Sequence, residues 1–138
     1  MLTTMKISVS TKGFTDIKDL TPQVRQALRE SGLQEGTATI FVSGSTAGIT
    51  TIEYEPGLLE DLPTAFEKLA PMKARYTHDD TWHDGNGYAH VRAALLGPSL
   101  VVPFANGDLL LGTWQQIVLV DFDNRPRRRE IVVQFAGE

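Results

Sequence analysis

The sequence predicts an α+β fold, predominantly antiparallel sheet with two or three helices, in a single domain over residues 1–138. At least six segments have the alternating or β-branched pattern of strands. Asn106-Gly107 lies between two of them and is the strongest short signal for a hairpin. Only two or three segments have helical spacing, so antiparallel sheet dominates.

The N-terminal part begins with a strand and a well-marked helix. Met5–Ser10 alternates apolar and polar residues, as in a half-buried strand. In the helix that follows, Thr21 is the expected N-cap, Pro22 suits the first helical position and Gly32 suits the C-cap. Thr37–Val42 is rich in β-branched and aromatic residues and is expected to form the second strand.

The central part is expected to contain a strand, a helix and a long loop. Ile49–Tyr54 is strand-like, and Leu58–Leu69 has a helical apolar pattern that Pro63 is expected to break or restart. Tyr76–Tyr88 is polar throughout and indicates a loop. Ala89–Leu96 can then form two helical turns that end at Gly97-Pro98.

The last third is expected to be all β. Four strands are predicted there, at Leu100–Phe104, Asp108–Leu111, Gln116–Phe122 and Glu130–Phe135.

Composition excludes several classes of function. The chain has no cysteine, so it has no disulfide and no thiolate chemistry. Its net charge of −4 gives no bulk attraction to nucleic acid or to anionic lipid. No apolar run approaches the roughly 18 residues of a membrane span, and the N-terminus shows no secretion signal. We therefore expect a soluble, cytoplasmic protein that binds neither nucleic acid nor membrane.

A histidine cluster is the most informative feature of the chain. His78, His83 and His90 lie within thirteen residues, together with Asp84 and Asn86. Imidazole and carboxylate groups bind Zn²⁺ and related ions, and they also perform acid–base catalysis near neutral pH. If His90 lies in the first turn of a helix, the helix dipole lowers its pKa. The spacing matches no strict metal motif, so a solvated acidic loop with incidental histidines is the alternative.

Two further candidates lie between and along the central strands. In the turn Ser43–Gly48, the hydroxyls of Ser45 and Thr46 and the backbone N–H groups could hold a phosphate or carboxylate. A tight turn that requires small residues explains this segment as well. Glu53 could project toward the histidines as a third ligand or base, and an ordinary exposed glutamate is the alternative.

The C-terminal third adds two more candidates. Trp114 and Gln115 precede a strand and could stack on and hydrogen-bond to a planar ligand, although a core tryptophan beside a buried amide is equally compatible. Arg125 and Arg127–Arg129 could bind an anion, but solvated charge at a hairpin is the simpler interpretation.

The order of these motifs resembles one known family, the YjbQ-type proteins, also called secondary thiamine-phosphate synthase-like proteins. The matching elements cover nearly the whole chain, and the Gly-Thr-Trp-Gln element is the most specific of them. They are Ser45–Gly48, Glu53, Tyr76-x-His78, Asp84–Asn86, Ala89-His90, Leu96–Leu100, Pro103, Asn106-Gly107, Leu111–Gln115, Arg127–Arg129 and Gly137-Glu138.

The resemblance implies a compact α+β fold, a predominantly antiparallel β-sandwich with two or three helices, that assembles as a homotrimer and has weak thiamine-phosphate synthase activity. That reaction joins a pyrimidine diphosphate to a thiazole phosphate, releases pyrophosphate and usually requires a divalent metal such as Zn²⁺ or Mg²⁺. Small phosphorylated molecules are then the expected substrates. The expected roles are metal ligation or acid–base chemistry for His78 and His90 with help from Asp84 and Glu53, loop orientation for Asn86, phosphate binding for Ser45 and Thr46, and pocket lining for Trp114 and Gln115.

The chain departs from the family pattern at Gly44, where the small-residue motif typically begins with histidine. One hypothesis is that His83 moves in as a replacement metal ligand near His78 and His90. The contrary hypothesis is that the ligand set is lost, in which case Gly44→His should restore metal binding. The loss favours an alternative function, a non-catalytic trimeric module that binds a small anion, a metal or a partner protein.

Overall fold

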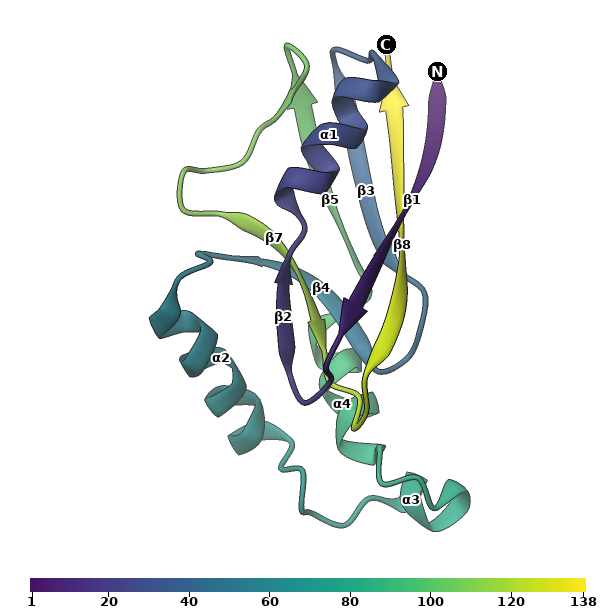
Figure 1. The fold of residues 1–138 in the computed structure, drawn as a ribbon, viewed down its shortest axis with the longest axis vertical. Helices are drawn as coiled ribbons and strands as arrows, with labels where there is room; N and C mark the ends of the chain where they lie inside the picture. Colours follow the sequence, from purple (N-terminus) through teal and green to yellow (C-terminus); the bar gives the residue numbers. More distant parts are fainter.

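Two antiparallel sheets organise the chain, as Figure 1 shows for the computed structural model, which describes residues 1–138. The larger sheet has the strand order β1-β8-β3-β5-β6, and the smaller one has the order β2-β7-β4. The predicted α+β class is therefore confirmed. The strands are β1 (Leu2–Thr11), β2 (Asp16–Asp19), β3 (Gly36–Val42), β4 (Ala47–Ile52), β5 (Ser99–Ala105), β6 (Asp108–Leu109), β7 (Gln116–Asp121) and β8 (Arg127–Gly137).

Strand β7 is buried on both faces and separates two apolar clusters. Ile117 and Leu119 belong to the larger cluster, between the two sheets and helix α1 (Thr21–Ser31). Val118 and Val120 point the opposite way, into a smaller cluster. Helices α2 (Pro56–Leu69) and α4 (Gly87–Leu96) cover that smaller cluster. Burial on both faces explains why this strand reads as a continuous apolar run.

The start of α1 differs from the prediction in its capping residue. Leu20 occupies the N-cap position, and Asp19 Oδ1 accepts a hydrogen bond from the Thr21 backbone N–H at 2.9 Å. The Thr21 hydroxyl instead accepts a hydrogen bond from the Ile117 N–H at 2.8 Å, which ties the helix to β7. The predicted C-cap is correct, since Gly32 is left-handed with φ of 72°.

Helix α2 continues through Pro63, so the predicted break is wrong. Proline removes one backbone hydrogen bond to the carbonyl four residues earlier. Packing compensates, because Phe66 is buried and makes an edge contact with Phe122 at a centroid distance of 4.8 Å. Tertiary burial thus outweighs the local cost of the proline.

The polar segment predicted as a loop contains a short helix, α3 (Thr77–Trp82). Polar composition alone indicated the loop, but Asp79 and Asp80 in the first turn suit the positive end of a helix dipole. Figure 1 shows α3 and α4 together at the end of the molecule opposite the two termini. No helix is both long enough and apolar enough to cross a membrane.

Candidate functional site

Three predicted residues meet at the junction of α3 and α4. His78 lies on α3, Asp84 on the connecting loop and His90 on α4, and one ligand atom from each lies within 4.8 Å of the others. His78 Nε2 is 3.4 Å from Asp84 Oδ2, and the two imidazole rings lie 4.3 Å apart at an angle of 46°. The fold therefore assembles two imidazoles and one carboxylate into a compact group.

The loop that carries Asp84 is held against the connection between β7 and β8. Asn86 is buried, and its Oδ1 accepts a hydrogen bond from the Asn124 N–H at 3.0 Å. The Asn124 side chain donates to the Asp84 carbonyl at 2.8 Å. The Gly87 N–H donates to Asp79 Oδ1 at 2.9 Å. Asn86 thus ties the loop to a distant segment of the chain.

Two groups in the cluster have shifted pKa values. The Asn86 backbone N–H donates to Asp84 Oδ1 at 3.1 Å and, with help from His78, lowers the pKa of Asp84. Burial lowers the pKa of His90, and the neighbouring His78 lowers it further. A lowered pKa for His90 agrees with the prediction. The predicted cause was the helix dipole, whereas the causes in the structure are burial and a second imidazole. Both shifts favour the forms that bind metal, a carboxylate and a neutral imidazole.

We expect His90 in metal-free protein to titrate below its ordinary value of 6.5. Because the fold favours neutral His90, its contribution to stability is complete above pH 6.5 and is lost as the pH falls through the lower folded pKa. NMR titration of the imidazole C–H signals in EDTA measures this. In His78→Gln the His90 midpoint should rise but stay below 6.5, since burial is the larger cause. A wild-type midpoint above 6.5 would contradict the burial of His90.

A buried ionic network lies beneath the site. Arg129 donates from Nε to Asp121 Oδ2 at 2.7 Å and from Nη2 to Asp121 Oδ1 at 2.9 Å. Arg127 donates to Asp123 at 3.0 Å. Burial opposes ionisation of Asp123, but the side chains of Asn86, Thr46 and Arg127 outweigh it and lower its pKa.

The phosphate-binding role predicted for Thr46 does not fit its surroundings. Thr46 is buried, its hydroxyl donates to Asp123 Oδ2 at 2.9 Å, and the same oxygen accepts from Arg129 Nη2 at 2.6 Å. Its hydroxyl is therefore committed to the network. Ser45 is exposed and lines a cavity of about 350 Å³ that also borders His90.

Solvated charge at a hairpin is the wrong interpretation for Arg129, which is only 8% exposed. A signal in the sequence could have identified it. Positions in a strand that are two apart share a face, so Arg129 lies on the same side as the buried Ile131 and Val133. Asp121 and Asp123, on either side of Phe122, supply the matching buried carboxylates and were also missed.

Three predicted site residues lie away from the histidines. Ala47, at the start of β4, borders the cavity beside His90, whereas Glu53 follows the other end of that strand, roughly 20 Å along an extended chain. Gln115 is at that far end as well, since its side chain donates to Thr51 at 3.2 Å. Trp114 is 73% exposed, so the alternative of a core tryptophan is wrong.

His83 is not part of the three-residue group. It ends α3 in a left-handed conformation with φ of 54°, and its N–H donates to the Asp79 carbonyl at 2.8 Å. Its side chain is exposed. The structure therefore does not place His83 as a replacement for the family's missing histidine.

Gly44 occupies the position of that histidine and is constrained by Arg129. Its φ is +138°, and a Cβ there would lie 2.7 Å from Arg129 Nη1. A histidine at this position would be strained and would have to displace the buried guanidinium.

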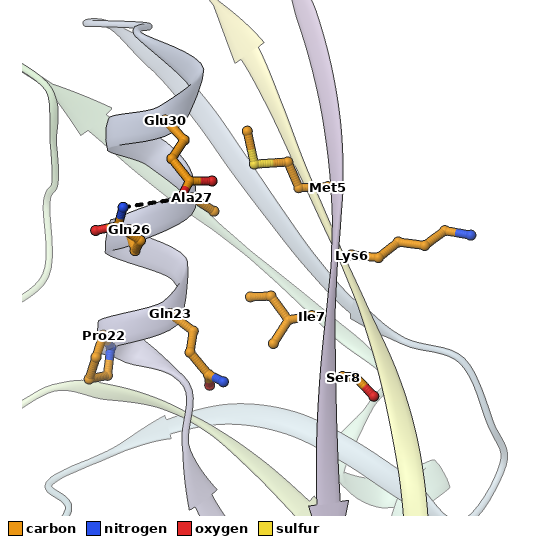
Figure 2. A pocket seen from close by; sticks show the side chains of 9 residues that line it. All are labelled: Met5, Lys6, Ile7, Ser8, Pro22, Gln23, Gln26, Ala27 and Glu30. Carbon is orange, nitrogen blue, oxygen red and sulfur yellow. Dashed lines mark hydrogen bonds between the residues drawn. The ribbon is translucent and has the colours of Figure 1, made fainter.

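The largest cavity in the molecule, about 690 Å³, lies elsewhere. Figure 2 shows it between α1 and β1, with Met5 and Ile7 pointing toward the helix and Lys6 pointing away. Glu30 in its wall accepts a hydrogen bond from Gln26 at 3.1 Å. No histidine lines this groove, so the chemistry available at the α3–α4 junction is absent from it.

Comparison with known proteins gives consistent matches over the full chain. Residues 5–138 match the family model described as "UPF0047 protein YjbQ-like". The chain belongs to the YjbQ family. A UPF0047 protein of Archaeoglobus fulgidus is 38% identical over 130 residues, which is 94% of this chain and 98% of that protein.

Solved structures of YjbQ-like proteins show the same fold. A YbjQ-like protein of unknown function from Sulfolobus solfataricus P2 has a TM-score of 0.94 and 37% identity, covering 100% of this chain and 99% of the other. A conserved YjbQ/UPF0047 protein from Clostridium acetobutylicum has a TM-score of 0.87 and 34% identity, covering 96% and 99%. The resemblance to the YjbQ family is thereby confirmed, and so is the fold that it implied. A substrate follows from neither.

Proposed function

We propose that the protein is a metal-dependent enzyme that acts on a small phosphorylated molecule, with His78, Asp84 and His90 as ligands of a divalent metal. The observation that supports this most strongly is the convergence of their three ligand atoms within 4.8 Å. Catalytic zinc sites commonly use three protein ligands and leave a further position open for water or substrate.

The residues fit such an ion in chemistry, and one of the separations between their ligand atoms also fits it. Ligand atoms about 2.0–2.2 Å from a tetrahedral Zn²⁺ lie roughly 3.3–3.6 Å apart, and the separation between His78 Nε2 and Asp84 Oδ2 is 3.4 Å. The lowered pKa values of Asp84 and His90 keep both ligands deprotonated near neutral pH. Two imidazoles favour Zn²⁺ over Mg²⁺, which prefers oxygen ligands.

The surroundings of the site suit a small anionic substrate. A bound metal would supply Lewis-acid stabilisation of developing negative charge on an oxyanion. The cavity beside His90 is walled by small side chains and carries the free hydroxyl of Ser45. Thiamine-phosphate synthesis, with release of pyrophosphate, is the candidate reaction that the family resemblance contributes, and the proposed anion-binding cavity is compatible with it.

Metal content provides the direct test. We expect purified, untagged protein to retain about one zinc ion per chain after dialysis against zinc buffer, as measured by elemental mass spectrometry. His83→Ala should bind the same amount, because His83 lies outside the group. Zinc-free wild-type protein after this treatment would contradict the proposal.

Pyrophosphate release from the pyrimidine and thiazole substrates, absent in His90→Ala, would then identify the reaction.

A trimeric binding module is the second candidate, and an exposed apolar surface favours self-association. Val101 on β5 is 60% exposed and Leu110 after β6 is 61% exposed, and both border one hollow of about 320 Å³. Apolar side chains that gather in this way often mark contacts between proteins. We therefore include the homotrimer in the proposal. Binding of zinc and phosphate without turnover of any phosphorylated substrate would favour the module over the enzyme.

A further inference from the structure

One nitrogen of the buried Arg129 guanidinium has no protein partner. Nε and Nη2 donate to Asp121, and Nη2 also donates to Thr46. No hydrogen bond involves Nη1, although the residue is 92% buried, with 8% of its surface exposed. Nη1 keeps some access to solvent, because the fully buried side-chain atoms without a partner are Tyr88 Oη and Asp123 Oδ1, so an incoming acceptor can reach its free N–H pair.

Because Gly44 has no side chain, it leaves Arg129 Nη1 accessible. A Cβ at position 44 would lie 2.7 Å from Nη1, so any side chain there would press on the guanidinium. Gly44 also lines the cavity beside His90, together with the exposed Ser45. Ser45 Oγ has no hydrogen-bond partner in the protein and is available to a ligand. Arg129 does not itself line the cavity, but its Nη1 lies against Gly44 in the cavity wall, one residue before the free hydroxyl of Ser45.

We propose that Arg129 Nη1 and the Ser45 hydroxyl form an oxyanion-binding site, which holds a phosphate group of the substrate beside His90. Arginine suits this task because its planar donors match the oxygens of phosphate. The choice of a phosphorylated substrate rests on the proposed function, whereas the anion site itself depends only on Arg129, Gly44 and Ser45. Thr46 and Asp121 are then positioning residues that fix the orientation of the guanidinium.

The local charge determines how strongly the site can bind. Arg129 forms an ion pair with Asp121, and its Nη2 lies 3.8 Å from Asp123 Oδ2. Arg127 forms a second ion pair, with Asp123. Two arginines and two carboxylates leave this network without net charge, so phosphate gains one charge-assisted hydrogen bond rather than a free ion pair. A divalent cation at the neighbouring cluster would add attraction, and phosphate should therefore bind more tightly once zinc is present.

Side-chain NMR of the wild-type protein tests the site without any mutation. Metal-free, ¹⁵N-labelled protein in EDTA is titrated with inorganic phosphate, and the Arg129 guanidinium and Ser45 amide signals are followed against a sodium chloride titration at equal ionic strength. We expect both signals to shift and saturate with phosphate only. Absence of a saturable shift at Arg129, or an equal shift with chloride, would overturn the proposal.

Three variants assign the contacts. Ser45→Ala should weaken phosphate binding roughly tenfold, the usual loss for one hydrogen bond to a charged group. Ser43→Ala is the matched control, since Ser43 is an exposed serine of the same turn that does not line the cavity, and its affinity should equal that of wild type. Gly44→Ala should abolish the Arg129 shift in folded protein. Unchanged affinity in both Ser45→Ala and folded Gly44→Ala would overturn the site.

The outcome is separable from that of the metal proposal. Phosphate binding in EDTA with no zinc retained after dialysis would support the anion site and contradict the metal centre. Zinc retention without a saturable phosphate-induced shift of the Arg129 signal would support the metal centre and contradict the anion site.

Discussion

Replacement of Arg129 with methionine is expected to destabilise the fold by about 3–5 kcal/mol, the usual effect of removing one member of a buried ion pair. Asp121 is fully buried and would lose two charge-assisted hydrogen bonds, at 2.7 and 2.9 Å. Thr46 would lose a third, at 2.6 Å. The methionine would fill the space but could not neutralise the buried carboxylate.

Chemical denaturation gives this free energy of unfolding. Arg128→Met is the matched control, since Arg128 is exposed in the same strand and donates only to Ser8. Its loss should change stability by less than about 0.5 kcal/mol. Addition of Asp121→Asn to Arg129→Met should cost less than the sum of the two single changes, because the residues act as a pair. An effect of Arg129→Met as small as that of the control would mean that the network adds nothing to stability.

Replacement of His90 with alanine is expected to weaken zinc binding by at least about 100-fold. Loss of a residue that only supports a metal ligand costs 10- to 100-fold, so loss of a ligand should cost at least as much. His90 supplies one of the three ligand atoms, and the centroid of its ring lies 4.3 Å from the centroid of the His78 ring. The two groups that would be left, one imidazole and one partly exposed carboxylate, form an incomplete site.

Competition with a chromophoric chelator measures this affinity. His83→Ala should match wild type, which would also exclude the hypothesis that His83 replaces the family's missing histidine. Circular dichroism should show both variants folded, since neither side chain is fully buried. Equal zinc affinity in His90→Ala and wild type would exclude His90 as a zinc ligand and would mean that other residues bind the ion.

The sequence alone determined the class of fold and most of the elements. Period-2 alternation placed β1, and Asn106-Gly107 placed the β5–β6 hairpin, where both residues have positive φ, of 54° and 74°. These signals are local, since a turn or a pleat depends on neighbouring residues. The clustering of His78, Asp84 and His90 was also visible, because only thirteen residues span them.

Only the tertiary structure decided which candidates share a site. Glu53 and Ser45 are eight positions apart, yet an extended strand carries them to opposite ends of the small sheet. Arg129 comes from β8 and Asp121 from β7, strands of different sheets whose side chains meet beneath the turn at Gly44. Contacts of this kind depend on how layers pack, and burial then turns arginine and aspartate, surface residues by composition, into a fixed ion pair.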